Sequence, residues 1–468
     1  MIAKLRPAGM DRGERMVLVL IASALGCVVL SLTFGALGAL AYMPAASETL
    51  LEGGVSLAQL RPLHTTFASA WLFLAAAAGA YAYLNTEFGE TTAGDAWRFR
   101  IQMVLWGLAG LGAIFTLPFG IVSGREYLAL HPALSLMIWV GWALFCWTFI
   151  SKVRREFFAR PVYVYMWSVG MLFFLWTFAE GHAYLLPWMK QRPLADLQVQ
   201  WKSCGTLVAS FNQMVYAGLL YIGVQKSGDE SLGHSRSAFA LFGIGLLNSF
   251  TNYVHHTYHL PQAEFLKWIS FVVSMLEVII LVIVIKEVVQ ALRAKSLAGV
   301  AIFDASTSLF GLAKSWNMCL LFLALLISIP PLNTLIHGTH VVMAHSMGSE
   351  LAIDSYILLG SFAFILGSLF PDPKVGEALI HAPRVQSSIR FLNVFLVCLV
   401  VLLVVEGLTI GITRYLGSPA PEWLIAFPPF FLVFGLGVAF FFLRLIVCWL
   451  PLMLAPAAFR NRSSIHSN

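Results

Sequence analysis

Apolar residues in this chain are gathered into twelve stretches, each long enough to cross a lipid bilayer as a helix. A transmembrane helix needs about 20 consecutive apolar residues, and the stretches are close to that length or longer. Only helices and closed barrels satisfy the backbone inside lipid, and long unbroken runs indicate helices. The predicted spans are approximately 16–42, 64–84, 99–121, 132–151, 162–180, 200–224, 238–258, 265–292, 309–330, 335–370, 389–415 and 423–453.

The spans fill most of the 468 residues and leave no room for a soluble domain. Hydrophobic residues make up 59% of the chain and charged residues 11%, a balance outside that of soluble domains. We therefore predict an all-α integral membrane protein, a bundle of about twelve transmembrane helices forming a single domain over residues 1–468. The first stretch is too long for a signal-peptide core, so we interpret it as a retained anchor.

Basic residues are concentrated in alternate connections. They precede the first span and follow the fourth, eighth and twelfth spans. The positive-inside rule then predicts that both termini lie in the cytoplasm. The net charge of +6 is accounted for by these connections, which suit anionic lipid and give no reason to expect a nucleic-acid partner.

Three histidines and a methionine interrupt the tenth span, where polar side chains are costly unless they serve a cofactor, a proton or an ion. They are His337, His340, His345 and Met347. His345 and Met347 are two residues apart, so on a helix they project about 200° apart. One helix could therefore offer an imidazole to one cofactor and a thioether to another, which suggests a redox protein.

The predicted topology places the other candidate ligands at a similar depth. His64 begins the second span, Cys204 lies near the start of the sixth, and His255 and His256 lie near the end of the seventh. With His345, they all fall in the outer half of the membrane, which favours one common site over separate core histidines. Twelve-span transporters also gather polar residues near mid-depth, so depth alone leaves that class open.

These residues, in this order, resemble the haem-copper oxidase superfamily, and most closely the catalytic large subunit of cytochrome c-dependent nitric oxide reductases. The resemblance implies two b-type haems, with His64 on the low-spin haem and His345 on the high-spin haem. It implies that His255 and His256 bind a non-haem metal, either iron or copper. The segments that carry the resemblance are 63–66, 71–73, 79–81, 124–127, 255–256, 274–277 and 337–345.

The resemblance also implies roles for residues around the haems. Glu126 matches a glutamate that helps to bind calcium near the haem propionates. Arg125, His337 and His340 are expected to contact those propionates. Glu277 falls where the family keeps a glutamate beside the active site, and we expect it to donate protons.

Three positions depart from the family pattern. Met347 stands where the family has the second low-spin haem ligand; it is either that ligand, as a thioether, or a packing residue. Cys204 stands where a third metal-binding histidine is expected, and it either completes the site as a thiolate or fills the space of a lost histidine. Val208 replaces an active-site glutamate. Many oxidases have a tyrosine one turn after the position of Cys204, and this chain has none there.

The sequence therefore predicts a membrane haem reductase that passes electrons to a haem and metal site and reduces nitric oxide to nitrous oxide. Expected partners are an extracytoplasmic cytochrome c or a haem c-bearing small subunit, membrane lipid and a small gaseous substrate. The expected location is the bacterial inner membrane. One alternative is a non-catalytic haem subunit for electron transfer, sensing or assembly that lacks the second metal. Another is a divergent nitric oxide dismutase or an oxygen reductase.

Overall fold

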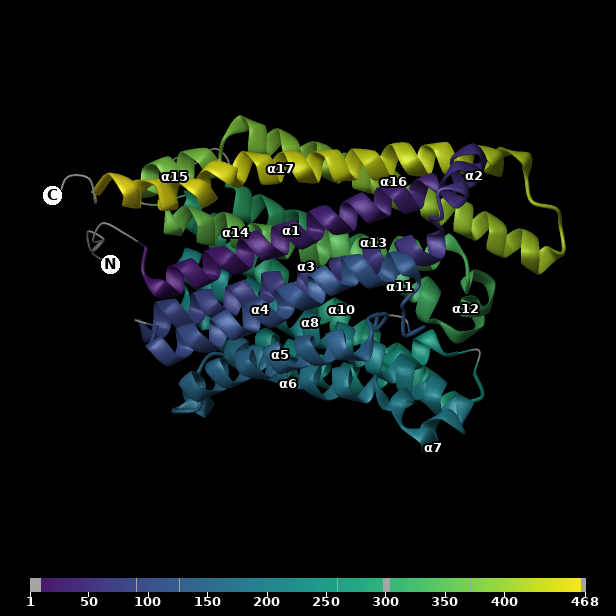
Figure 1. Cartoon of the computed structure of the whole chain (residues 1–468), viewed down its shortest axis with the longest axis horizontal. Helices are drawn as coiled ribbons and strands as arrows, with labels where there is room; N and C mark the ends of the chain where they lie inside the picture. The colour runs from purple at the N-terminus through teal and green to yellow at the C-terminus, as the bar shows by residue number, and fades with distance from the viewer. Residues whose placement is uncertain are drawn as a thin grey trace.

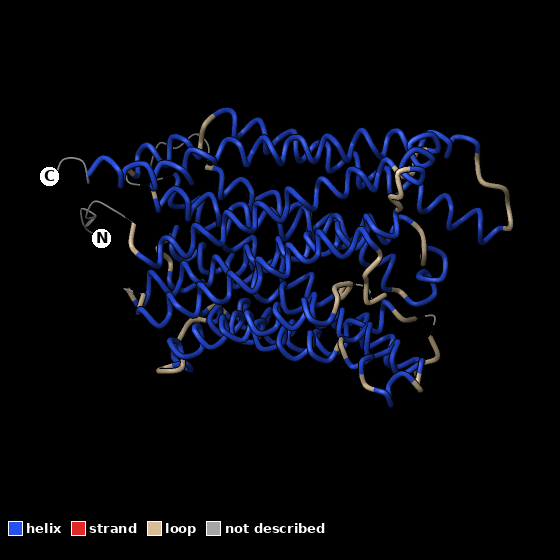
Figure 2. The backbone as a smooth tube through the Cα atoms, in the orientation of Figure 1, coloured by secondary structure: helices blue, strands red, loops and turns tan. Residues whose placement is uncertain are grey.

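The computed structural model describes residues 10–89, 91–125, 127–258, 260–297, 304–370 and 372–463. Within these ranges the regular secondary structure is entirely helical (Figure 2). The long helices lie side by side along the longest axis of the molecule (Figure 1). The prediction of an all-α bundle is confirmed.

The helices fall into long segments and short connecting turns. The long segments are α1 (Arg12–Leu40), α3 (Leu57–Phe88), α4 (Ala93–Thr116), α5 (Pro132–Val153), α6 (Val162–Glu180), α8 (Pro193–Ser227), α9 (Arg236–Thr251), α10 (Glu264–Leu297), α11 (Ala305–Ser328), α14 (Ser355–Leu369), α16 (Pro383–Leu416) and α17 (Phe427–Ser463). The short helices are α2 (Pro44–Glu52), α7 (Pro187–Lys190), α12 (Pro330–Ile336), α13 (His340–Met347) and α15 (Pro373–Ile380). The remaining turns are η1 (Leu117–Phe119), η2 (Phe157–Ala159), η3 (Ala183–Leu185), η4 (Glu230–His234), η5 (Asn252–His256), η6 (Gly348–Asp354) and η7 (Glu422–Ala426).

Eleven segments in the described ranges are long and apolar enough to cross a membrane. The seventh predicted span falls short of that count because α9 has 16 residues and ends in the 3₁₀ turn η5. The helix α1 begins and α17 ends at the same end of the bundle (Figure 1). A chain that starts and ends on one side crosses the membrane an even number of times. We therefore add α9 to the eleven segments, which gives twelve passes. The opposite end carries α2, α7 and α12, and we call it the outer end.

The tenth predicted span is divided into pieces. A break separates α12 from α13, and Gly338 in this break has a φ of +72°, a conformation that glycine adopts without steric cost. The Thr339 side chain then caps α13 by accepting a hydrogen bond from Val341 N. The continuous membrane span therefore begins at His340, five residues later than the sequence predicts. After Met347 the helix continues through η6, a π-helical turn, into α14.

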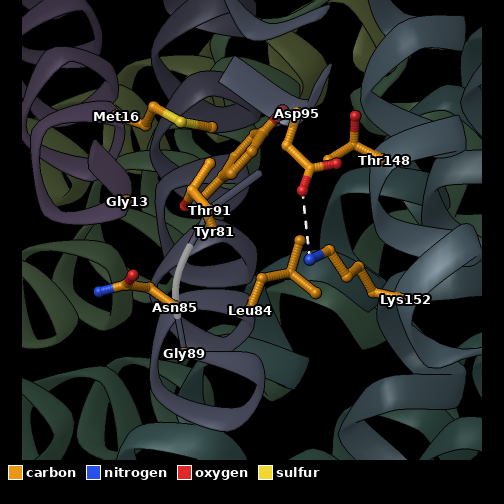
Figure 3. Close-up of a pocket in the computed structure, with 10 residues that line it drawn as sticks. All are labelled: Gly13, Met16, Tyr81, Leu84, Asn85, Gly89, Thr91, Asp95, Thr148 and Lys152. Carbon is orange, nitrogen blue, oxygen red and sulfur yellow. Dashed lines mark ion pairs between the residues drawn. The ribbon is translucent and has the colours of Figure 1, made fainter. Parts of the chain in front are cut away.

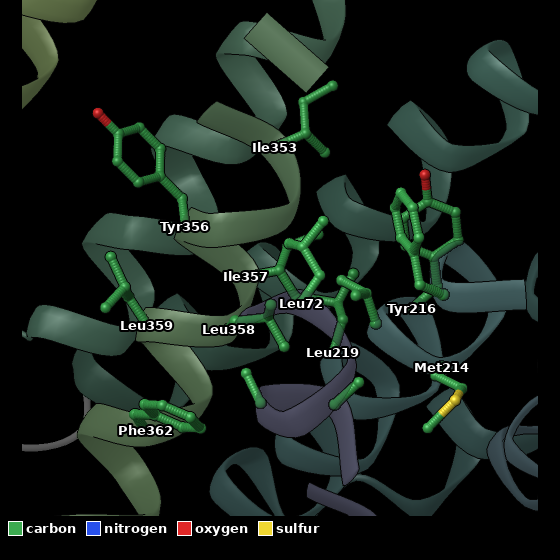
Figure 4. Close-up of a cluster of buried hydrophobic side chains, with 14 of the residues drawn as sticks. Leu72, Met214, Tyr216, Leu219, Ile353, Tyr356, Ile357, Leu358, Leu359 and Phe362 are labelled. Atoms are coloured by element: carbon green, nitrogen blue, oxygen red, sulfur yellow. The ribbon is translucent and has the colours of Figure 1, made fainter. Parts of the chain in front are cut away.

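The bundle interior is apolar and aromatic where α3, α8 and α14 meet (Figure 4). Trp71 and Phe362 are buried there, and Trp71 Nε1 donates a hydrogen bond to Ser355 Oγ at 3.0 Å. The outward faces keep large apolar side chains such as Phe115 and Trp147, which are about two-thirds exposed at 68% and 67%. Such faces suit a lipid solvent, in keeping with a multi-pass membrane protein.

Candidate redox site

His64 on α3 is held in place by α1. Its Nδ1 lies 2.9 Å from the carbonyl oxygen of Ser31, and Ser31 Oγ donates to the His64 carbonyl at 3.2 Å. Gly35 makes room for the ring, because a Cβ at that position would lie 2.8 Å from His64 Nδ1. A histidine that donates from Nδ1 to a carbonyl presents an unprotonated Nε2, which is the form that binds a metal. His64 therefore fits the role of an axial haem ligand.

His345 lies near the adjacent pair His255 and His256, towards the outer end. The two adjacent rings on η5 have centroids 4.2 Å apart at 43°. His345 on α13 lies close enough to interact electrostatically with both, and His337 does so with His256. Within the described residues, Nδ1 of His255 and Nδ1 of His345 are buried without a hydrogen-bond partner. Orphaned buried ring nitrogens are rare in proteins, so these residues fit a site that binds an additional group.

The helix α8 packs against the turn that carries this histidine pair. Asn252 Nδ2 donates to the carbonyl of Gly205 at 3.0 Å, and the absence of a side chain at Gly205 permits the approach. The ring of His256 stacks on Trp201, with centroids 5.7 Å apart at 10°. Cys204 is buried one turn further along α8 than Trp201, so the two residues lie on the same side of the helix.

The candidate metal ligands do not form a closed set. Among the described residues, no three His, Cys, Asp or Glu side chains are grouped so that they could hold a metal ion. Lys202, two residues before Cys204, is paired with Glu180 Oε2 at 2.6 Å, so a neighbouring carboxylate balances its charge. Metal binding by Cys204, His255 and His256 remains a prediction.

The other residues of the tenth span lie around α13. Met347 is its last residue and is partly buried against the hydrophobic core. His340 Nδ1 lies 2.5 Å from Glu406 Oε2 of α16, so a protein carboxylate already holds this ring. Arg414 Nη2 donates to the His337 carbonyl at 2.9 Å. Contacts of His337 and His340 with haem propionates remain a prediction.

Arg125 is held by protein groups. Its guanidinium pairs with Asp196 Oδ2 at 2.6 Å, donates to Gln200 Oε1 at 3.1 Å and lies over the ring of Tyr184 at 4.6 Å. The predicted contact with a propionate therefore concerns a side chain that already has an anionic partner. Glu126, the predicted calcium ligand, lies outside the described residues.

Glu277 on α10 is buried and is hydrogen-bonded to α9. Asn248 Nδ2 donates to Glu277 Oε2, and Ser274 Oγ donates to Asn248 Oδ1 at 3.0 Å. A Cβ built on Gly245 would lie 2.2 Å from Gln213 Nε2 and 3.3 Å from Glu277 Oε1, so both atoms face the same point. The sequence interpretation missed Asn248 and Gln213. The sequence feature that could have identified them is the one that identified the histidines: a polar side chain inside an apolar span.

A separate pocket of about 20 Å³ lies between the inner ends of α1, α3, α4 and α5 (Figure 3). Asp95 and Lys152 form an ion pair there at 3.2 Å. The volume is sufficient for about one water molecule. Gly13 lines this pocket and Ser31 contacts His64, and these residues are separated by about 27 Å along α1. The pocket is therefore distinct from the histidine site.

Comparison with known proteins identifies the family. The model for cytochrome c and quinol oxidase polypeptide I matches residues 15–440, and the chain belongs to that family. It is thus a membrane protein of the haem-copper oxidase superfamily, whose members bind haems and a second metal and carry out redox chemistry. No curated protein sequence matches the chain.

Among solved structures, a haem-copper terminal oxidase dimer determined by cryo-electron microscopy matches with a TM-score of 0.64. The match covers 96% of this chain and 84% of that chain, at 14% sequence identity. At this identity the likeness concerns the fold alone. It supports the predicted subunit I-like helical bundle.

Proposed function

We propose that this chain is a haem-bearing membrane reductase that converts nitric oxide to nitrous oxide. The observation that carries the proposal is that His345 lies within electrostatic reach of His255 and His256, while the buried Nδ1 atoms of His255 and His345 have no hydrogen-bond partner among the described residues. When bound, a haem at His345 and a metal at the histidine pair would supply the place where a small diatomic gas receives electrons. Two nitric oxide molecules, two electrons and two protons give one nitrous oxide and one water.

The residues of α3 and α13 would hold the electron-transfer haem. His64 is oriented by Ser31 so that Nε2 is available, and Met347 supplies a thioether two residues after His345. A His/Met ligand set favours the reduced iron and raises the reduction potential. Electrons would arrive from an extracytoplasmic cytochrome c or a haem c-bearing subunit at the outer end of a protein in the bacterial inner membrane.

Glu277 is the proposed proton donor. Its Oε2 accepts the hydrogen bond from Asn248, whereas its Oε1 lies beside Gly245, on the side where Gln213 Nε2 also lies. We assign the transferable proton to Oε1, because Oε2 already accepts the hydrogen bond from Asn248. Burial in the bundle limits competing exchange with bulk water, and Asn248 fixes the orientation of the carboxyl group.

A non-catalytic haem subunit is the second candidate. Val208 lies where a catalytic carboxylate is expected, and it is packed against the hydrophobic core. The described residues also lack a grouped set of three metal ligands. These observations favour a role in electron transfer, sensing or assembly without a second metal. A divergent dismutase or an oxygen reductase would instead retain the second metal and differ in its substrate.

Quantification of haem, iron and copper in the purified protein separates these candidates. The reductase proposal requires two b-type haems, one metal beyond the haem iron, and consumption of nitric oxide with formation of nitrous oxide. Two haems without a further metal and without turnover would support the non-catalytic subunit. Release of oxygen from nitric oxide, or consumption of oxygen alone, would assign the third class.

A further inference from the structure

A buried aspartate, Asp354, has two glutamates within electrostatic reach, beyond the histidine site. Asp354 and Glu350 are four residues apart on η6 and therefore lie on one side of that turn. Glu350 and Glu277 both lie close enough to Asp354 to interact with it electrostatically. Asp354 is only 1% exposed, and within the described part of the chain neither of its carboxyl oxygens has a hydrogen-bond partner.

An amide on α8 points to the same region. Gln213 is 1% exposed, and both polar atoms of its side chain lack a hydrogen-bond partner among the described residues. Its Nε2 and Glu277 Oε1 face the same point above Gly245. Tyr216 lies three residues further on α8 and close enough to Asp354 and Glu277 to interact with both. In Figure 4 its hydroxyl points towards the end of the apolar cluster where Ile353 lies.

These unpartnered groups require a polar occupant. An ionised carboxylate at membrane depth with neither a cation nor a donor is strongly disfavoured, and neighbouring carboxylates cannot all be ionised. A metal cation would need converging ligands, which the described residues do not provide. Water can bridge several orphaned groups, and carboxyl groups can share a proton through it.

We propose that Asp354, Glu350 and Glu277, together with Gln213 and Tyr216, form a hydrated site that stores an exchangeable proton. Asp354 holds this proton as a neutral carboxylic acid. On release, the O–H bond of Asp354 breaks and the proton passes to water, and on reloading the carboxylate takes a proton from water. No electron changes hands at this site.

The position of the site suits a proton reserve for the histidine site. Asp354 lies nine residues beyond His345 along α13 and η6, a rise of about 13 Å along the helix axis. Glu277, the proposed proton donor to the histidine site, would connect the two. Delivery of the proton to the histidine site rests on the proposed function. The presence of the proton on Asp354 does not.

Infrared spectroscopy of the purified full-length protein tests the proposal. Transfer from H₂O to D₂O should shift the carbonyl band of a protonated carboxylic acid, and the shifting band should be lost in Asp354→Asn. Asp95→Asn is the matched control, because Asp95 is also buried, at 3% exposure, but is ion-paired with Lys152 at 3.2 Å. That control should leave the band unchanged.

Labelling aspartate with carbon-13 in the unaltered chain shows, without a variant, whether the band comes from an aspartate. The exchangeable band should move to lower frequency on labelling. Absence of the band, its persistence in Asp354→Asn, or its failure to respond to the label would each overturn the proposal. Loss of nitric oxide turnover or of the second metal would leave this band in place, so a failure of the proposed function is separable from a failure of this one.

Discussion

Gly35 and His64 are packed so closely that a single added methyl group at Gly35 would lie 2.8 Å from His64 Nδ1. We expect Gly35→Ala to displace the imidazole and weaken the contact with Ser31, at a cost of about 1–3 kcal/mol from overpacking. If His64 binds the low-spin haem, the optical signature of that haem should diminish or shift, whereas the signal of the second haem, for which His345 is the proposed ligand, should remain. Reduced-minus-oxidised spectra and a pyridine haemochrome assay measure both.

Gly26→Ala on the same helix is the control for this experiment. A Cβ at Gly26 would meet no atom within 4 Å, and alanine favours the helix by up to about 1 kcal/mol. Its spectrum should match that of the parent protein. Equal loss of the low-spin signal in both variants would show that α1 is sensitive to any substitution, and would remove the support for His64 as a ligand.

Substitutions at Met347 test the second ligand of the low-spin haem. Met347→His should convert the haem to bis-histidine ligation and lower its reduction potential, because imidazole stabilises the oxidised iron more than a thioether does. Met347→Leu should leave the haem high-spin or open to exogenous ligands. Potentiometric titration monitored by absorbance provides the measurement. An unchanged low-spin spectrum in both variants would assign Met347 to packing.

Cys204→Ser removes a soft donor at nearly constant volume. If the thiolate binds the second metal, the purified variant should lose that metal and its nitric oxide turnover but retain both haems. Cys204→His restores the ligand type of the family and should keep or increase turnover. Elemental analysis and a nitric oxide electrode give the two readouts. Identical metal content and turnover in the parent and in Cys204→Ser would leave the thiol with a space-filling role.

The ion pair between Lys226 and Asp304 joins α8 to the start of α11, with Lys226 Nζ 2.6 Å from Asp304 Oδ1. Burial acts to raise the pKa of Asp304, but the Lys226 charge and the Thr307 hydroxyl outweigh it and hold the pKa below its ordinary value. The stabilisation is thus present above about pH 4 and is lost as the pH falls through the lowered pKa.

Asp304→Asn should therefore lower the thermal stability at pH 7 by about 1 kcal/mol, and this difference should shrink in more acidic buffer. Asparagine is also a good N-cap, so the variant isolates the charge from the capping of α11. Melting curves in detergent at several pH values provide the test. A difference between the parent and the variant that stays constant with pH would contradict the assignment.

Hydrophobic length predicted the bundle because lipid leaves the backbone few options. The roles of His64, His255, His256 and His345 as ligands stay a prediction. What the sequence did not reveal depends on local backbone geometry. The break at Gly338 requires a residue with a positive φ, and a hydropathy pattern does not encode backbone dihedral angles. The short α9 likewise ends in a 3₁₀ turn, and this turn presents the histidine pair.

Hydrogen-bond and ion-pair partners that lie on different helices could not be predicted either. Ser31 on α1 and Asn248 on α9 are ordinary polar residues in apolar runs, and their roles follow only from the helices they face. The pairing of Arg125 with Asp196 joins residues 71 positions apart and had no local signal. The helical bundle is therefore readable from one chain, whereas hydrogen-bond partners across helices are not.

The π-helical turn η6 affects how this chain can be aligned with its relatives. A π-turn accommodates an extra residue within an otherwise α-helical segment, and each residue in an α-helix turns it by about 100°. Against a relative without such a turn, an alignment that treats positions 340–369 as uninterrupted α-helix would carry Asp354 to another face and assign it a wrong counterpart. Equivalent positions on either side of η6 should therefore be matched by superposition, with one register up to Met347 and another from Ser355 onwards.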